Sequence, residues 1–146
     1  MIAPLSPHAP PRSLTTHAGS CTVYCNGATM RAYCRDEITV VHITGEVDAT
    51  NIDRFFEYAH RFASDAPGLI LNLSEVDFLC ARGLFVLRAV DSLCRAERRA
   101  WAIVTSPAVK RLLQVGDPKA TLPTASSERE ALTTIDADRR TDLAAS

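Results

Sequence analysis

The chain has 146 residues, of which 47% are hydrophobic and 23% are charged, with a formal net charge of −1. This length and composition predict one globular domain with an ordinary hydrophobic core. The near-neutral charge gives no electrostatic support for nucleic-acid binding, and the apolar runs are too short to span a bilayer.

The N-terminal segment, residues 1–20, is proline-rich and has no periodic pattern, so we expect a disordered tail. It lacks the apolar stretch of a secretion signal, which favours a cytoplasmic location with reduced cysteines. The odd number of cysteines, five, argues against a complete set of disulfides. Cys21 and Cys25 lack the second close pair that a metal site of this kind needs, so no metal or cofactor is expected.

The first half of the domain predicts three strands joined by tight turns. Asn26-Gly27 is a strong hairpin signal because both residues tolerate positive φ, and Asp36-Glu37 predicts a second tight turn. The third strand is apolar on both faces, apart from His42, so it is expected at the centre of the sheet. We expect these strands at residues 21–24, 29–35 and 38–44.

A helix is predicted directly after these strands. Asp48 is placed to cap it by accepting a bond from an early backbone N–H. Pro67-Gly68 ends the segment. The apolar stripe recurs at three- and four-residue steps and consists of Ile52, Phe55, Phe56, Ala59 and Phe62.

Residues 69–87 form the segment around which the rest of the chain is organised. They begin as a buried strand, pass through an expected polar turn at Ser74-Glu75, and continue as a short extended piece, residues 76–79. A helix is expected to begin at residues 80–83 and to end near Glu97, with Leu84, Leu87, Val90 and Leu93 on its buried side. Open α/β sheets bind ligands and partners where a strand ends at a helix N-terminus, so we predict the functional surface at residues 80–85.

The remaining segments predict a strand at 101–105, a short helix, an edge segment from Leu122 and a last helix. Ser106-Pro107 is typical of a helix start, and Gly116 is expected as its C-cap. Ser127 and Glu130 have capping-box spacing. The order predicts a mixed α/β sheet, antiparallel first and parallel later, with packed helices. The domain is expected to span residues 21–135, followed by a flexible tail at 136–146.

The motifs of the common enzyme classes are absent from the sequence. There is no G-x-G-x-x-G or G-x-x-x-x-G-K-[ST] phosphate loop, no G-x-S-x-G elbow and no H-E-x-x-H. The sequence therefore favours a non-enzymatic binding module.

Four segments in this order resemble the STAS domain of bacterial anti-sigma factor antagonists, over roughly residues 29–135. They are G-E-V-D at 45–48, L-N-L-S-E-V-D-F-L at 71–79, G-L at 83–84 and S-P-A-V-K-R-L-L-Q-V-G at 106–116. The resemblance implies a STAS-like fold, to which the hairpin around Asn26-Gly27 is an addition. It also implies binding to a kinase-like anti-sigma factor, and thereby regulation of sigma-factor-dependent transcription and stress response.

In that family the kinase inactivates its antagonist by phosphorylating a serine or threonine at the start of the second helix, in a pattern close to D-S-[ST]-G-L-G. Here Ala81 and Arg82 occupy the two hydroxyl positions, so the resemblance does not extend to the phosphorylation switch. Arg82 carries a fixed positive charge. Phe85 replaces the second glycine, either as an exposed contact or folded back onto the first helix.

The predicted partner-binding residues are Glu46, Asp48, Cys80, Ala81, Arg82, Gly83, Leu84 and Phe85. An alternative is a STAS module of another assembly, such as a stress complex or a transporter accessory. A further alternative is a redox protein using Cys80, because a helix N-terminus and Arg82 would favour its thiolate. Cys80 has no C-x-x-C partner, and Cys94 lies about 20 Å further along the same helix.

Overall fold

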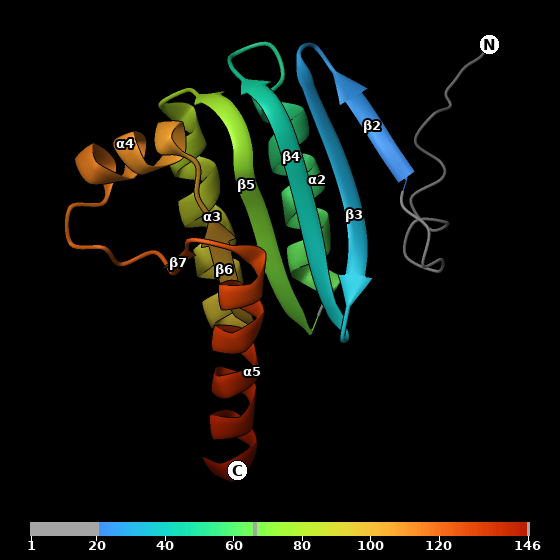
Figure 1. Ribbon diagram of the computed structural model, residues 1–146, viewed down its shortest axis with the longest axis vertical. Helices are drawn as coiled ribbons and strands as arrows, with labels where there is room; N and C mark the ends of the chain where they lie inside the picture. Colours follow the sequence, from blue (N-terminus) through green and yellow to red (C-terminus); the bar gives the residue numbers. More distant parts are fainter. Residues whose placement is uncertain (1–20, 66, 146) are drawn as a thin grey trace.

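The computed structural model describes residues 21–65 and 67–145. The expected N-terminal tail, residues 1–20, lies outside this range. The described strands form one six-stranded sheet in the order β2-β3-β4-β5-β6-β7, as Figure 1 shows. The strands are β2 (Cys21–Cys25), β3 (Ala28–Arg35), β4 (Ile38–Val47), β5 (Gly68–Leu79), β6 (Ala100–Val104) and β7 (Thr124–Ala125).

The first half of the sheet is antiparallel, as predicted, because tight turns join its strands. Strand β2 pairs with β3, and β3 pairs with β4. Asn26 and Gly27 adopt φ values of 44° and 95°, which is the positive-φ geometry that a two-residue hairpin turn requires. Asp36 and Glu37 also have positive φ, at 52° and 71°. The sequence therefore placed both turns correctly.

The second half of the sheet is parallel, with β4, β5, β6 and β7 paired in sequence order. The expected turn at Ser74-Glu75 is wrong, because β5 runs without interruption from Gly68 to Leu79. Its pairing with β4 shifts register twice, once between His42 and Thr44 and once between Gly45 and Glu46. Bulges of this kind absorb extra residues and bend a strand without ending it.

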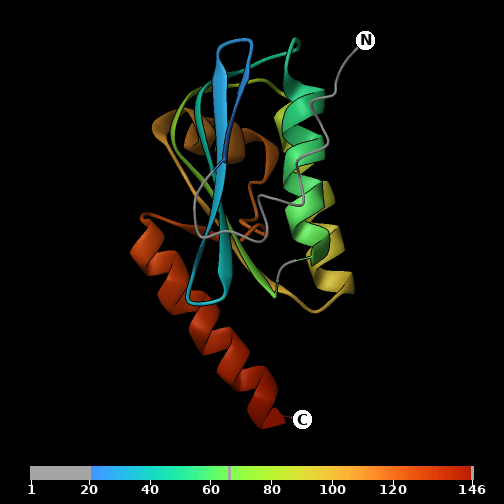
Figure 2. The same ribbon diagram turned by 90° about the vertical axis from the view of Figure 1, so that its right-hand side faces the viewer.

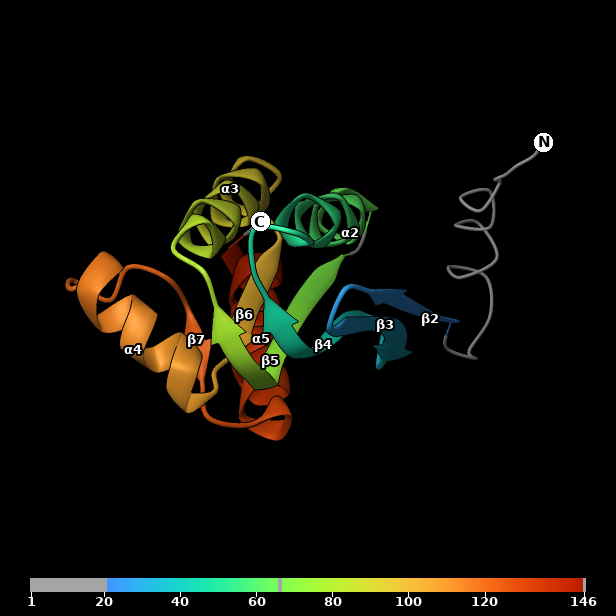
Figure 3. The ribbon, with the colours of Figure 1, turned by 90° about the horizontal axis from the view of Figure 1, so that it is seen from above.

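The helices cover both faces of the sheet. Figure 3 shows α2 (Ile52–Asp65) and α3 (Arg82–Ala96) on one face and α5 (Glu128–Ala145) on the other. Helix α4 (Pro107–Gly116) lies at the end of the sheet beside β5. No helix in the described part of the chain is both long and apolar enough to cross a membrane.

Two apolar clusters hold these layers together. Central strands β4 and β5 contribute to both, which explains why they are apolar on both faces. The larger cluster packs against α2 and α3 and includes Met30, Val41, Ile43, Phe55, Leu71, Leu87 and Ile103. The smaller cluster packs against α5 and contains Ile38, Val40, Ile70, Ala102, Val104, Ala125, Ala131 and Ile135.

The buried faces of two helices differ in detail from the sequence prediction. In α2, Phe55 is fully buried, whereas Phe56 is only partly buried. In α3, Val86 is buried, while Leu84 and Leu93, predicted as buried, lie partly exposed. Neighbouring apolar residues on a helix point about 100° apart, so a wide apolar stripe leaves its edge residues at the surface.

Two of the predicted helix starts have the expected capping bonds. The Ser106 hydroxyl accepts a bond from the Val109 N–H at 3.2 Å, and Pro107 is at the first helical position. The Ser127 hydroxyl accepts from the Glu130 N–H at 3.1 Å. Helix α5 continues through Ala145, so residues 136–145, which were expected in a flexible tail, are helical. Figure 2 shows its C-terminal half projecting beyond the sheet.

One carboxylate anchors the start of α5 to the sheet. Glu128 accepts bonds from the Tyr33 hydroxyl at 2.8 Å and the Asn72 amide at 2.9 Å, and it also pairs with Arg35. Burial alone would raise the pKa of Glu128, but the bonds from Arg35, Tyr33 and Asn72 outweigh it and hold that pKa below its usual value. Burial and the Glu128 bond raise the pKa of Tyr33 to about 12.

The difference in burial between Phe55 and Phe56 predicts different costs of truncation. Phe55→Ala should lower the free energy of unfolding by about 3–5 kcal/mol, the usual cost of emptying a core aromatic site. Phe56→Ala should cost less than half as much, because its ring is partly in water already. Urea denaturation of both variants checks this, and equal midpoints for the two would contradict the assignment of the buried face.

Candidate functional site

The structure brings the two predicted segments together at the carboxyl ends of the central strands β4 and β5. Glu46 pairs with Phe78, and Val47 pairs with Leu79. The Cys80 N–H then donates to the Val47 carbonyl at 2.9 Å. We call the predicted residues Glu46, Asp48 and 80–85 the β4–α3 surface.

The start of α3 is built by the backbone rather than by a capping side chain. Ala81 precedes the helix in a helical conformation and provides no side-chain cap. The Gly83 and Leu84 N–H groups donate to the carbonyls of Cys80 and Ala81, at 2.8 and 3.1 Å. The side chains at this turn are therefore not needed for capping and are available for other contacts.

Gly83 has a packing role at this turn. A Cβ atom at this position would lie 2.4 Å from the Leu79 Cδ1 atom, closer than real contacts allow. The missing side chain thus lets α3 begin directly over the end of β5. Gly83 and the partly buried Leu84 fix the helix, whereas their neighbours face the solvent.

The exposed members of this turn are Ala81, Arg82 and Phe85. The Phe85 side chain is 70% exposed, so the alternative in which it folds back onto the first helix is wrong. Phe78 was not among the predicted partner-binding residues. It is 49% exposed and lies at the adjoining end of β5. Two aromatic side chains are therefore accessible near the start of α3, where apolar exposure is typical of interaction surfaces.

Arg82 is the cationic group of the β4–α3 surface. One of its guanidinium nitrogens lies 3.4 Å from a carboxylate oxygen of Asp53 on α2. Both side chains are largely exposed, at 61% and 85%. Exposed ion pairs of this kind are weak, so Asp53 does not hold the guanidinium firmly in place.

Asp48 has a structural role in the loop before α2. Its carboxylate accepts bonds from the Thr50 hydroxyl at 2.6 Å and from the Thr50 N–H at 2.9 Å. The hydroxyl bond, followed by the backbone bond, holds the pKa of Asp48 below its usual value. Glu46 is exposed, so it is the member of this loop whose carboxylate is open to a partner.

Sequence reasoning missed Asn51, the residue that fixes this loop. Its side chain is fully buried. Its amide nitrogen donates to the carbonyls of Cys25, Asn26 and Glu46 at 3.0, 3.1 and 2.9 Å, and its oxygen accepts from the Asp48 N–H at 2.9 Å. An asparagine directly before an amphipathic helix was the available signal, but that position suggests a cap rather than a bridge to a distant hairpin.

The thiols differ in accessibility. Cys25, Cys34, Cys80 and Cys94 are free. Burial raises the pKa of the Cys94 thiol to about 11, and Cys80 is partly buried against the larger core cluster. In residues 21–65 and 67–145, no group of three or more His, Cys, Asp or Glu side chains could hold a metal ion.

The start of α3 also contacts α4. A Cβ atom on Gly116 would lie 2.4 Å from a Leu84 methyl carbon, so a side chain there would displace Leu84. The predicted C-cap role of Gly116 is wrong, because it is the last residue of α4 and Asp117 is the C-cap. Arg88 donates to the Gly116 carbonyl at 2.6 Å and lies 3.7 Å from a carboxylate oxygen of Asp117. These contacts fix α4 beside the β4–α3 surface.

The burial and bonds of Asn51 predict that it stabilises both the fold and the loop. Asn51→Ala should lower the free energy of unfolding by about 1–3 kcal/mol, because it leaves buried carbonyl groups without donors. Thr50→Ala, which removes one exposed hydroxyl, is the matched control and should cost less. Urea denaturation provides the measurement, and equal stability of Asn51→Ala and wild type would contradict this role.

Comparison with known proteins agrees with this architecture. Residues 29–131 match the STAS domain family model. A relative, Osmosensory protein A of Mycobacterium tuberculosis (strain ATCC 25618 / H37Rv), is 38% identical, with 90% of this chain and 87% of that protein covered.

Solved structures show the same fold. An anti-sigma factor antagonist from Mycobacterium paratuberculosis has a TM-score of 0.65 and 25% identity, covering 75% of this chain and 94% of that one. The anti-sigma factor antagonist SpoIIAA in its unphosphorylated form has a TM-score of 0.61 and 15% identity, covering 74% and 96%. The family match begins within β3, so β2 lies outside it. The sheet, its helices and these matches together establish that the chain belongs to the STAS domain family.

Proposed function

We propose that this chain is a cytoplasmic anti-sigma factor antagonist that binds a kinase-like anti-sigma factor and so regulates sigma-factor-dependent transcription. The observation that carries the proposal is the exposed turn at the start of α3, where Arg82 and Phe85 face the solvent, next to the end of β4 that carries Glu46. The similarity to an anti-sigma factor antagonist at 25% identity supports this function. The proposed role is binding without catalysis, in keeping with the regulatory character of the family.

The proposed recognition combines one cation with an exposed aromatic ring. Arg is suited to pairing with a partner carboxylate because its planar guanidinium presents several donors in a fixed arrangement. Phe85 offers apolar surface that association would remove from water. Arginine and phenylalanine are both enriched at protein interfaces, and arginine is also enriched among the residues that contribute most of the binding energy.

In this proposal, the chain lacks the family's usual phosphorylation switch at the start of α3. Neither Ala81 nor Arg82 carries a hydroxyl group. The hydroxyls of Thr50 and Ser74, which lie elsewhere, already donate to Asp48 and Asn72 at 2.6 and 2.7 Å. We therefore propose that phosphorylation at residues 80–84 does not control partner binding.

Reversing the charge of Arg82 tests the proposed surface. The partner for this test is an anti-sigma factor recovered by affinity capture with this protein. Arg82→Glu should weaken binding to it by about 1–3 kcal/mol, because the substitution removes a cation and introduces an anion at the interface. An acidic residue in the first helical turn is compatible with the helix dipole, so the domain should remain folded. Titration calorimetry measures the affinity.

Arg129→Glu is the matched control for this variant. Arg129 is also exposed in the first turn of a helix, but α5 lies on the opposite face of the sheet. The Arg129→Glu variant should bind the partner with the same affinity as the wild-type protein. Unchanged affinity of a folded Arg82→Glu protein would remove the start of α3 from the interface and favour the hairpin around Asn26-Gly27 instead.

A second experiment tests the missing switch. After incubation with ATP and the captured anti-sigma kinase, residues 80–84 should remain unmodified, because they contain no serine or threonine. Peptide mapping by mass spectrometry locates any phosphate. Phosphate on Thr50 or Ser74 together with a loss of partner binding would show that the kinase controls this protein through another site.

The relative named Osmosensory protein A favours a second candidate function, in which this STAS domain serves an assembly that responds to osmotic stress. Affinity capture from native cells under osmotic stress separates the two. Recovery of an anti-sigma factor supports the first candidate, and recovery of a multiprotein complex without one supports the second. A Cys80-based redox activity, the remaining alternative, predicts turnover that Cys80→Ser abolishes.

A further inference from the structure

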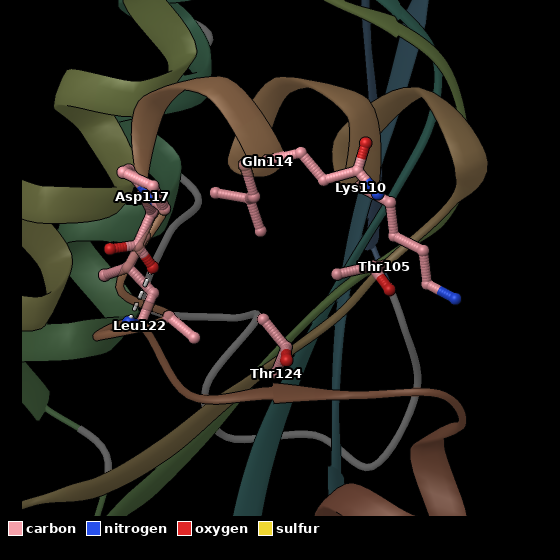
Figure 4. Close-up of a pocket in the computed structure, with 9 residues that line it drawn as sticks. Thr105, Lys110, Gln114, Asp117, Leu122 and Thr124 are labelled. Carbon is pink, nitrogen blue, oxygen red and sulfur yellow. Dashed lines mark hydrogen bonds between the residues drawn. The ribbon is translucent and has the colours of Figure 1, made fainter.

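A hollow of about 320 Å³ lies between α4, the carboxyl end of β6, and the loop that leads into β7. Figure 4 shows Lys110 and Thr105 on one side of it and Asp117 and Leu122 on the other. The β4–α3 surface contributes no lining residue. The complete lining is Thr105, Lys110, Leu113, Gln114, Asp117, Pro118, Ala120, Leu122 and Thr124. Its volume is in the lower range of small-molecule sites.

Several polar side chains of the lining are unused by the fold. Within the described residues, the side chains of Thr105, Lys110, Gln114 and Thr124 make no hydrogen bond or ion pair. Thr105 is the notable case, because only 9% of the residue is exposed. Its hydroxyl oxygen has no partner in the described part of the chain and is not fully enclosed, so it can meet water or a ligand from the hollow.

The charge available to a ligand in this hollow is positive. Asp117 is buried, and its carboxylate accepts from the Thr121 hydroxyl at 2.6 Å, the Thr121 N–H at 3.1 Å and the Leu122 N–H at 2.9 Å. These bonds, the hydroxyl bond first, and nearby Arg88 hold its pKa below the usual value. Asp117 is ionised, and the Arg88 guanidinium, 3.7 Å from its carboxylate, supplies the opposite charge, which leaves the Lys110 ammonium as the unpaired charge of the lining.

The rest of the lining is apolar. Leu113 and Leu122 are buried, and Pro118 and Ala120 complete this part of the wall. An apolar wall combined with a few convergent polar groups is typical of small-molecule sites. The location also agrees with the general rule that open α/β sheets bind ligands beyond the carboxyl ends of their parallel strands.

We propose that this hollow binds a small organic anion. Its carboxylate or phosphate group pairs with Lys110 and accepts bonds from the hydroxyls of Thr105 and Thr124. Its apolar body packs against Leu113 and Leu122. This site is separate from the β4–α3 surface and does not depend on the identity of the protein partner.

Titration of the full-length protein with benzoate, followed by amide NMR spectra, tests the proposal. Benzoate combines a flat apolar body with one carboxylate, and benzamide is its neutral counterpart. Benzoate should cause saturable shifts at the amides of Thr105, Lys110, Gln114 and Thr124. Benzamide should bind at least about tenfold more weakly, because charge-assisted bonds are roughly twice as strong as neutral ones. Phenyl phosphate in a parallel titration decides between carboxylate and phosphate as the preferred group.

Two variants assign the binding to individual groups. Lys110→Met should reduce benzoate affinity at least about tenfold. Lys119→Met, which alters an exposed lysine outside the lining, should leave that affinity unchanged. Thr105→Val should weaken benzoate binding without lowering the melting temperature, because the hydroxyl it removes has no partner in the described fold.

Three outcomes would overturn the proposal. They are the absence of saturable shifts with both benzoate and phenyl phosphate, equal affinity for benzoate and benzamide, and equal effects of Lys110→Met and Lys119→Met. A lower melting temperature of Thr105→Val would also count against it, since it would assign the hydroxyl to the fold. None of these results bears on binding of an anti-sigma factor through Arg82.

Discussion

The candidate surface depends on one buried amide, that of Asn51. Its bonds to the carbonyls of Cys25, Asn26 and Glu46 connect the first hairpin, the end of β4 and the start of α2. The hairpin lies so close to β4 that a Cβ atom on Gly45, whose φ is 96°, would lie 2.2 Å from the Gly27 carbonyl oxygen. The hairpin is therefore attached to the loop that carries Glu46 and Asp48. Strand β2, although outside the family match, thereby contributes to the geometry of the candidate site.

A second polar group performs a similar task on the other face of the sheet. Asn72 lies in the middle of β5, where it donates to Glu128 and accepts bonds from the Ser74 N–H and hydroxyl at 3.0 and 2.7 Å. The first register shift of β5 against β4 occurs at this point. The same residue thus satisfies the backbone at an irregular position and holds the start of α5. Buried polar groups that are fully bonded in this way specify one arrangement of the surrounding elements.

The sequence predicted the features that depend on local chemistry. Asn26-Gly27 specified its turn because few residues accept positive φ, and Ser106-Pro107 specified a helix start because both residues suit that position. The α2 stripe was identified, but its burial was wrong in detail, since periodicity alone does not distinguish Phe55 from Phe56. The continuous course of β5 was missed because Ser74 and Glu75 are polar and exposed, and a bulge has no strong sequence signal. The contacts of Asn51 join residues 25 positions apart in sequence, which no local pattern reports.

The candidate site was predicted as a segment, and the structure divides that segment by role. Gly83 packs against the Leu79 side chain, and Leu84 packs against Gly116, so a larger residue at position 83 or 116 would force the neighbouring leucine to shift. Ala81, Arg82 and Phe85 have no such neighbours and face the solvent. The family pattern is retained at Gly83 and Leu84, and it is lost at the three exposed positions and at the partly buried Cys80. This division has a physical explanation. Packing keeps the helix in place whatever the exposed side chains are, so the chemistry presented at this turn can change from a phosphorylated hydroxyl to a fixed cation without a change of fold.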